Sequence, residues 1–449
     1  MCHLWIKCLA TWILLKRCNS VHVMQTKAPM YPNEPFLVFW NAPTTQCKLR
    51  YNVDLDLKTF HIVSNAKESL SGSAVTIFYP NQLGVYPHID DHGNFLHGII
   101  PQNESITKHL KKTKSDLNYM IPLKTFHGLG VIDWENWRPQ WDRNWGSKNV
   151  YRTRSIQFAK QLHPGLSEAA IKRLAKQEYE KAGKRFMRDT LLLAKNMRPG
   201  GYWGYYLYPD CYNYNYKQNP QQYTGKCPEI EIARNDQLLW LWRESTALFP
   251  SIYLEIMLKS SANALKFVHH RLKESMRIAS KARKDYALPV FVYARPFYAY
   301  TFEPLTKEDL VTTIGETAAM GAAGIVFWGS MRYASTIESC QIVKDYMNGP
   351  FGHYIVNVTS AAKICSYFLC KKKGRCVRKH SNSNAFLHLF PESFRIMVHA
   401  NATHRKAIVK GKLELDNLRY LRKNFVCQCY KGWKGLYCED HYKKEENYI

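Results

Sequence analysis

Two carboxylates stand two residues apart where an apolar run ends. The run Gly128-Leu-Gly-Val-Ile is followed by Asp133-Trp134-Glu135. Alternate residues of a strand share a face, so Asp133 and Glu135 are expected on one side, about 6–7 Å apart along the backbone. Carboxylates this close do not ionise independently, and one is expected to keep its proton near neutral pH. Such a pair can break an acetal, as glycosidases do. A solvent-exposed acidic strand end is the alternative interpretation.

The residues around this pair form an extended motif, and further motifs follow in a fixed order. Gly-Val-Ile-Asp-Trp-Glu-Asn-Trp-Arg-Pro over 130–139 closely resembles the catalytic segment of the animal hyaluronidases. The resemblance covers roughly residues 33 to 440. The other matching segments are Phe39–Pro43, Thr76–Tyr79, Trp203–Asn213, Arg234–Leu238, Pro250–Tyr253 and Gly321–Gly329.

This resemblance implies an endo-acting hydrolase that cleaves β-1,4 N-acetylglucosaminide bonds in hyaluronan. The implied route is substrate-assisted and retaining: the N-acetyl oxygen of the substrate attacks the anomeric carbon. Glu135 would be the general acid and base. Asp133 and Tyr253 would orient the acetamido group, and Asp133 would keep Glu135 protonated.

The resemblance also assigns the walls of the cleft. Tyr206 would donate a hydrogen bond at the reacting centre, Trp328 would wall the sugar at the cleavage site, and Tyr79 would line the cleft. Arg271 matches an arginine that faces the uronate carboxylate, which an arginine can bind through two hydrogen bonds. An ordinary helix-surface arginine is the alternative for Arg271.

Two other hypotheses remain open at this point. In the first, the chain is a hydrolase that prefers chondroitin. In the second, it is a catalytically decayed paralogue that only binds glycosaminoglycans. Some relatives have an aspartate near positions 299–300, where this chain has Ala299-Tyr300. Tyr253 favours hyaluronan, because the chondroitin-preferring relative lacks this tyrosine.

The pattern of apolar segments predicts the scaffold. Short apolar runs alternate with helical stretches, of which 167–197 and 265–283 are the clearest, and this favours a parallel sheet buried on both faces. We expect an α/β fold, a distorted (β/α) TIM-like barrel over 30–360, with its chemistry at the C-terminal ends of the strands. The runs are Phe36–Trp40, Val75–Tyr79, Gly130–Asp133, Tyr202–Leu207, Ser251–Leu254, Pro289–Tyr293 and Gly324–Trp328.

Cysteines change the character of the chain after about residue 360. Their spacing resembles an EGF-like module, expected over 361–440 and followed by a polar tail over 441–449. The EGF-type connectivity implies three pairs: Cys365–Cys376, Cys370–Cys427 and Cys429–Cys438. Two pairs are then expected in the barrel: Cys211–Cys227 and Cys47–Cys340.

The remaining features concern location and partners. Residues 1–23 read as a signal peptide. The cysteine framework and three glycosylation sequons, at Asn103, Asn357 and Asn401, agree with a secreted protein or one in a secretory-vesicle lumen, acrosomal or lysosomal included. No apolar run is long enough for a transmembrane helix, and the polar tail argues against a lipid anchor.

The net charge and one His- and Asp-containing stretch bear on the partners and cofactors of the chain. The net charge of +27 suits an anionic partner, and for a secreted chain we expect a glycosaminoglycan, hyaluronan or chondroitin, rather than nucleic acid. The stretch His88-Ile-Asp90-Asp91-His92 offers metal-ligand types but fits a polar loop. We therefore expect no metal and no cofactor, and a chain that acts as a monomer.

Overall fold

The computed structural model describes residues 23–400 and 405–442. Residues 1–22 of the expected leader, the sequon residue Asn401 and residues 443–449 of the tail lie outside these ranges. Within them, no helix is both long and apolar enough to cross a membrane.

Two parallel sheets form the centre of the molecule. The first has the order β2 (Ile62–Ser64), β1 (Leu37–Asn41), β9 (Gly324–Trp328), β8 (Phe291–Ala294). The second has the order β3 (Val75–Phe78), β6 (Leu129–Ile132), β7 (Tyr202–Tyr205).

Within the described residues, irregular connections span the gaps between the two sheets without closing the ring. Between β7 and β8 lies a chain segment that makes single parallel bridges, Phe249 to Tyr206 and Leu248 to Val290. Between β2 and β3 the side chain of Asn65 replaces a strand partner: it accepts hydrogen bonds from the backbone N–H groups of residues 74 and 75 and donates to the carbonyl oxygens of Ser69 and Val75. The result is a distorted (β/α) barrel, as the sequence predicts.

One expected strand is wrong and one strand was missed. Ser251–Leu254 forms no regular strand, because Pro250 has no backbone N–H to give to a sheet, and only isolated bridges occur around it. Strand β2 has only three residues and follows a 3-10 turn, Leu57–Phe60, so it leaves too short a pattern to predict.

Alternate residues of the strands pack on the two sides of the barrel wall. Phe39, Ile77, Val131, Phe291 and Val326 belong to a buried cluster that fills the barrel interior. Their strand neighbours, such as Val38, Ile132 and Trp203, join the larger core under the helices. Period-two burial on both faces is what fixes the strand ends, and hence the site, in one place.

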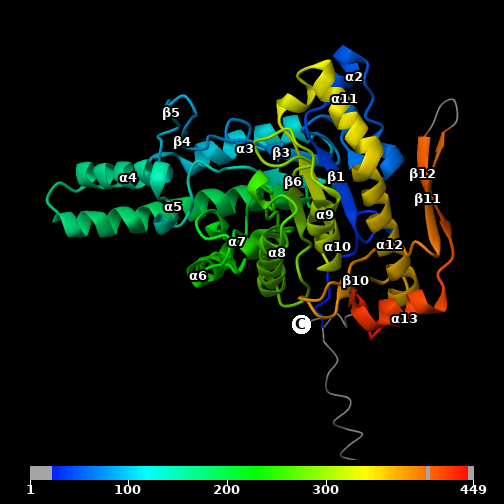
Figure 1. Cartoon of the computed structure of the whole chain (residues 1–449). Helices are drawn as coiled ribbons and strands as arrows, with labels where there is room; N and C mark the ends of the chain where they lie inside the picture. Colours follow the sequence, from blue (N-terminus) through cyan, green and yellow to red (C-terminus); the bar gives the residue numbers. More distant parts are fainter. Residues whose placement is uncertain (1–22, 401–404, 443–449) are drawn as a thin grey trace, which may run out of the picture.

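Helices surround this barrel (Figure 1). Helix α5 (Glu168–Met197) is capped by Ser167 as expected, and α8 (Ala262–Ala282) begins earlier than predicted because Ser261 caps it. The remaining helices are α2 (Thr45–Tyr51), α3 (Ile106–Met120), α4 (Asn149–Leu162), α6 (Glu229–Gln237), α7 (Leu239–Glu244), α9 (Lys307–Leu310), α10 (Glu316–Ala319), α11 (Ile337–Tyr346) and α12 (Gly352–Cys370).

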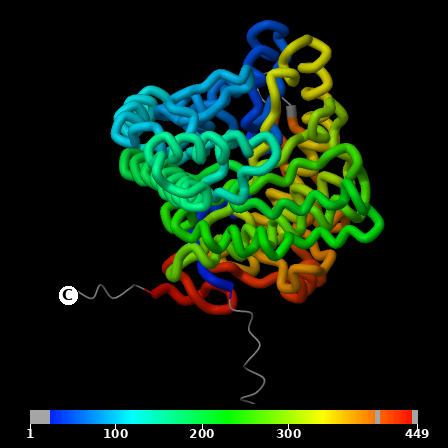
Figure 2. Tube along the Cα trace, turned by 90° about the vertical axis from the view of Figure 1, so that its left-hand side faces the viewer, coloured from blue at the N-terminus to red at the C-terminus, as the bar shows by residue number. Residues whose placement is uncertain are grey.

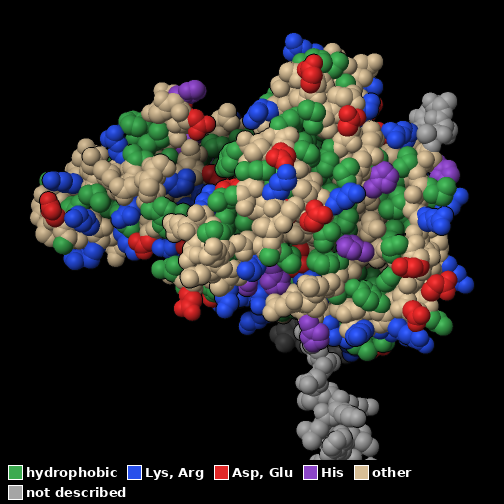
Figure 3. Space-filling model, in the orientation of Figure 1, with side chains coloured by type: hydrophobic (Ala, Val, Ile, Leu, Met, Phe, Trp, Pro, Cys, Tyr) green, Lys and Arg blue, Asp and Glu red, His purple; other side chains and the backbone are tan. Residues whose placement is uncertain are grey.

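Helices α4 and α5 lie side by side and project from the barrel as an arm (Figure 1). On the face drawn in Figure 3, Lys and Arg side chains gather toward the outer end of this arm. Part of the large positive charge therefore lies far from the centre of the barrel.

The C-terminal segment packs under the barrel. Strands β10 (Gly374–Arg378) and β13 (Phe425–Cys429) pair antiparallel, and the N-terminal residue Thr26 bridges to Tyr430, which places both ends of the described chain side by side (Figure 2). The hairpin of β11 (Phe394–Ala400) and β12 (Arg405–Gly411) stands beside α12 instead (Figure 1). The segment also contains α13 (Leu415–Asn424), β14 (Trp433–Lys434) and β15 (Asp440–His441).

Disulfides and one buried ionic group hold the parts together. The carboxylate of Glu316 on α10 accepts a hydrogen bond from Arg378 on β10 and contacts His269 on α8. The disulfide bonds of the described residues join the same pairs that the sequence implied: Cys47–Cys340, Cys211–Cys227, Cys365–Cys376, Cys370–Cys427 and Cys429–Cys438.

Candidate active site

A cavity of about 380 Å³ opens where the strands end. The expected residues reach it from the C-terminal ends of different strands: Asp133 follows β6, Tyr206 follows β7, and Trp328 ends β9. The expected site residues that line the cavity are Asp133, Glu135, Tyr206, Tyr253, Arg271 and Trp328. Tyr79 follows β3 and joins this group through Trp328, whose indole Nε1 donates a hydrogen bond to its hydroxyl at 3.0 Å.

The carboxylate pair lies just beyond its strand. Strand β6 ends at Ile132, and the backbone N–H of Asp133 continues the ladder by donating to Phe78 O. Trp134 points away into the core, where its ring stacks on Tyr86 with centroids 4.5 Å apart. Asp133 and Glu135 are left lining the same cavity, and only Glu135 is exposed as the interpretation of a solvent-exposed strand end expects.

The two carboxyl groups have different surroundings. The side chain of Glu135 is 49% exposed and lies 3.6 Å from the guanidinium of Arg138. Asp133 is half-buried as a residue, but its Oδ1 is fully buried and has no hydrogen-bond partner among the described residues. Burial, reinforced by the charge of Glu135, raises the pKa of Asp133 to about 8. The raised pKa therefore belongs to Asp133. From the sequence we expected the reverse, that Asp133 keeps Glu135 protonated.

Two cations hold the backbone that carries Glu135. Arg138 is buried and donates to the carbonyl oxygen of Glu135 at 2.8 Å, and Lys148 donates to the same oxygen at 2.6 Å. Burial and the nearby Arg138 lower the pKa of Lys148 to about 8. These contacts fix the loop after β6, so that Glu135 presents its carboxyl group to the cavity.

Aromatic side chains form one wall of the cavity. The rings of Tyr253 and Trp328 stack at 20° with centroids 6.2 Å apart, and Tyr206 lies 6.1 Å from Tyr253. The hydroxyl of Tyr206 donates to Ser251 Oγ at 3.3 Å. Flat apolar faces beside a few polar groups are suited to binding a sugar ring.

Arg271 is not a surface residue. It is only 3% exposed, its Nε donates to Asn213 Oδ1 at 2.8 Å, and its Nη1 donates to Ser251 O at 2.9 Å. Its Nη2 is buried without a hydrogen-bond partner among the described residues, although the side chain lines the cavity. The helix-surface interpretation is therefore wrong, and a donor is left over for a ligand.

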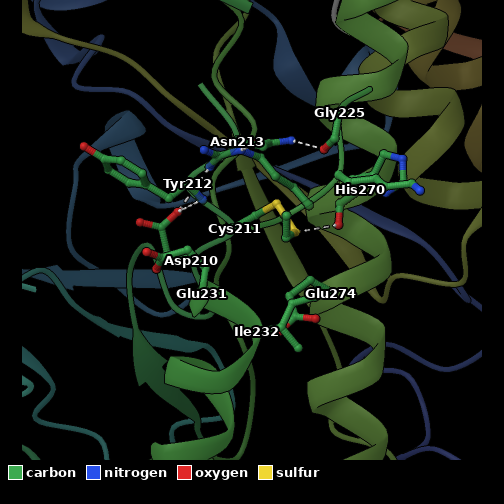
Figure 4. The surroundings of a disulfide bond; sticks show 12 residues. Asp210, Cys211, Tyr212, Asn213, Gly225, Glu231, Ile232, His270 and Glu274 are labelled. Atoms are coloured by element: carbon green, nitrogen blue, oxygen red, sulfur yellow. Dashed lines mark hydrogen bonds and ion pairs between the residues drawn. A yellow bond between two sulfur atoms is a disulfide. The ribbon is translucent and has the colours of Figure 1, made fainter. Parts of the chain in front are cut away.

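A disulfide-bonded loop after β7 positions the partners of Arg271 (Figure 4). Asn213 donates to Gly225 O at 2.7 Å, and the Cys211–Cys227 disulfide holds the loop against α8. Asp210 lies 3.7 Å from Arg271. Burial opposes its ionisation, but Arg271 and Arg143 together hold the pKa of Asp210 below its ordinary value.

Several cavity residues escaped the sequence argument. Arg138 stands inside a quoted motif, but its spacing did not indicate a role. Arg295 follows β8, and its position after an apolar strand was the one available signal. Ala299 and Tyr300, the departure noted in the sequence, both line the cavity and place no charge there.

The other predicted sites lie elsewhere. Asn103 is exposed, whereas Asn357 lies within α12, where its Oδ1 accepts from the N–H of Leu389 at 3.1 Å. Glycosylation of either stays a prediction. The expected polar loop is in part a hairpin: β4 (His88–Ile89) pairs with β5 (Phe95–Leu96), and His88 is buried and contacts Tyr86 O. Asp90 accepts hydrogen bonds from the amides that follow it, as in a turn.

A carboxylate pair in an aromatic cleft at the strand ends of a (β/α) barrel is the construction of a glycoside hydrolase. Comparison with known proteins narrows this class. The hyaluronidase family model matches residues 25–442, which is most of the chain. The chain belongs to the hyaluronidase family.

Individual relatives agree with this assignment. The chain is 82% identical to Hyaluronidase-1 of Bitis arietans and 81% identical to the hyaluronidase of Echis ocellatus, in each case over 99% of both chains. The crystal structure of bee venom hyaluronidase is similar at 32% identity and a TM-score of 0.64, over 72% of this chain and 99% of that one. The bee venom enzyme in complex with a hyaluronic acid tetramer gives 33% identity and a TM-score of 0.65, over 71% and 98%.

Proposed function

We propose that this chain is an endo-acting hydrolase of hyaluronan that cleaves β-1,4 N-acetylglucosaminide bonds. The observation that supports this most is the shared cavity, in which Asp133, Glu135, Tyr253 and Trp328 meet. The similarity to a bee enzyme described in complex with a hyaluronic acid tetramer agrees with this substrate. The intact carboxylate pair disfavours a decayed binding protein.

The chemistry follows the substrate-assisted, retaining route. The acetamido carbonyl oxygen attacks the anomeric carbon while Glu135 protonates the leaving glycosidic oxygen, and the bond to that oxygen breaks. Water then attacks the anomeric carbon from the other side, gives a proton to Glu135 and releases the acetamido oxygen. Two inversions leave the anomeric configuration unchanged. The carboxyl group of Glu135 is half-exposed, so it can give a proton to the glycosidic oxygen and later take one from water.

We assign the orientation of the acetamido group to Asp133 and Tyr253. The unpartnered Oδ1 of Asp133 is the acceptor we assign to the acetamido N–H. Holding the carbonyl oxygen over the anomeric carbon converts attack by the substrate on itself into a well-aligned intramolecular step. Tyr206 donates at the reacting centre, Trp328 and Tyr79 wall the sugar, and the free Nη2 of Arg271 takes a uronate carboxylate.

Digestion of polymers tests the proposal. The purified protein is incubated with hyaluronan and with chondroitin at acidic and neutral pH. It should cut hyaluronan at internal bonds, rather than from the chain ends, and so produce oligosaccharides. Size-exclusion chromatography of the products measures this. Absence of shortening at every pH would favour the glycosaminoglycan-binding paralogue, and faster shortening of chondroitin would favour the chondroitin-preferring hydrolase.

Tyr253 is expected to set the preference between the two polymers. Tyr253→Cys removes the ring that stacks on Trp328, and we expect hyaluronan turnover to fall about tenfold, with a smaller fall for chondroitin. Tyr253→Phe keeps the ring and is the control for packing. Initial rates on both polymers measure the effect, and equal factors for the two would remove Tyr253 as a specificity residue.

We further propose that the protein is secreted or held in a secretory-vesicle lumen and acts as a monomer. The disulfide bonds support an oxidising compartment. The division into a barrel over 30–360 and an EGF-like part over 361–440 stays a proposal: the paired strands β10 and β13 lie in the second part, whereas helix α12 (Gly352–Cys370) runs across the proposed boundary.

A further inference from the structure

One arginine of the cavity has no carboxylate to pair with. Arg138 lies 3.6 Å from Glu135, and Arg271 lies 3.7 Å from Asp210. Arg295 lines the same cavity, but no carboxylate of the described residues lies within 4.0 Å of it. Arginines in a cleft are normally neutralised by nearby acids, so the positive charge of Arg295 remains available.

Aromatic rings, rather than acids, surround this arginine. Its guanidinium lies 5.1 Å from the ring centroid of Trp328 and 5.8 Å from that of Tyr253. Its Nε is buried without a hydrogen-bond partner among the described residues. Burial raises the pKa of the nearby Tyr333, and the charge of Arg295 opposes that rise, so the guanidinium is also close to this phenol.

This environment is unfavourable for the free protein. A cation that is partly withdrawn from water and leaves a donor unpaired loses solvation that cation–π contacts replace only in part. An anionic group of a ligand in the cavity would supply the missing counter-charge at the accessible part of the guanidinium. The rings also hold the guanidinium in place, so little side-chain entropy is lost when a ligand binds.

We propose that Arg295 binds a uronate carboxylate of the substrate, next to the sugar that packs on Trp328. This inference rests on the proposed function. Uronates alternate with N-acetylglucosamine in hyaluronan, and their carboxylates are its only charges. Arg295 and Arg271 share no contacting side chain, so we assign them different uronates of one polymer. Arg295 is therefore a substrate-binding residue that selects for an acidic polymer.

The test compares hyaluronan with hyaluronan whose carboxyl groups have been reduced to alcohols. Arg295→Gln should raise the KM for hyaluronan about tenfold, the usual size of a charge-assisted contact, with a smaller change in kcat. With the reduced polymer, wild type should already bind weakly and Arg295→Gln should add little. Arg295→Lys keeps the charge and should lie between the two.

Controls separate this contact from packing and from sulfate binding. Arg332→Gln changes an exposed arginine of the 3-10 turn Met331–Ala334 and should leave both KM values unchanged. Equal losses on native and reduced hyaluronan would overturn the proposal, because Arg295→Gln would then act by disturbing the rings. A loss confined to chondroitin sulfate, absent with hyaluronan and desulfated chondroitin, would also overturn it, since the anion would then be a sulfate.

Binding without turnover separates failure of this inference from failure of the proposed function. Hyaluronan oligosaccharides are titrated calorimetrically into Glu135→Gln protein and into the same protein that also carries Arg295→Gln. A weaker Kd in the double variant supports the contact even if cleavage is never seen. An unchanged Kd rejects the contact, even if wild-type protein cleaves hyaluronan.

Discussion

Glu135→Gln is expected to lower the rate of hyaluronan cleavage by about 10²–10⁴-fold, which is the usual contribution of a positioned general acid. Glutamine keeps the shape of the side chain and the contacts of the Glu135 backbone with Arg138 and Lys148, but it has no proton to transfer. The Kd for hyaluronan oligosaccharides should therefore change little. Initial rates and calorimetric binding measure the two quantities.

A matched control distinguishes chemistry from charge. Glu392→Gln removes an exposed carboxylate in the C-terminal segment and should leave the cleavage rate unchanged. Glu135→Gln protein that cleaves at a rate near wild type would refute the assignment of the acid. Loss of binding and cleavage together would instead give Glu135 a structural role.

Asp133→Asn is expected to have opposite effects on activity and stability. Activity should fall by about 100-fold, because the acetamido group loses the carboxylate that aligns it, and small misplacements of a reacting group have effects of this size. Stability at pH 8 should rise by on the order of 1–3 kcal/mol, since a buried carboxyl group no longer has to ionise.

The direction of the pH dependence follows from the raised pKa of Asp133. Burial and the charge of Glu135 raise this pKa from its ordinary value of 3.8 to about 8. The folded protein holds the proton at pH values where the unfolded chain has released it. The stability from this group is thus fully present below about pH 4 and is lost as the pH rises toward 8.

Urea unfolding between pH 4 and pH 8 tests this difference. The wild-type and Asp133→Asn curves should coincide near pH 4 and separate as the pH increases, with the variant more stable. Curves that stay parallel over the whole range would show that Asp133 does not titrate in a buried environment. Asp91→Asn changes an exposed aspartate and provides the control for a change of net charge.

The sequence predicted the positions of the strand ends better than the surroundings of each side chain. Asp133, Tyr206 and Trp328 stand at the ends of apolar runs with a clear pattern, so their meeting at one end of the barrel could be predicted. The break at Pro250 and the three-residue strand β2 could not, because both depend on which backbone groups find partners in the folded chain.

The pKa values and charge partners in the site also could not be predicted from the sequence. The raised pKa of Asp133 comes from its burial, and burial depends on how Trp134 turns into the core. Residue type alone does not show whether Arg271 or Arg295 has an acidic partner. One lies 3.7 Å from Asp210, while the other lies among aromatic rings without an acid, and only the folded arrangement separates them.

The anomeric configuration of the first product distinguishes a retaining from an inverting reaction. Hyaluronan is digested by the purified protein and followed by proton NMR from the first minutes, before mutarotation mixes the anomers. The account predicts that new N-acetylglucosamine reducing ends appear first as the β anomer, and that Glu135→Gln protein produces none. New reducing ends that appear first as the α anomer would contradict the substrate-assisted route, since a single inversion leaves no place for attack by the acetamido oxygen.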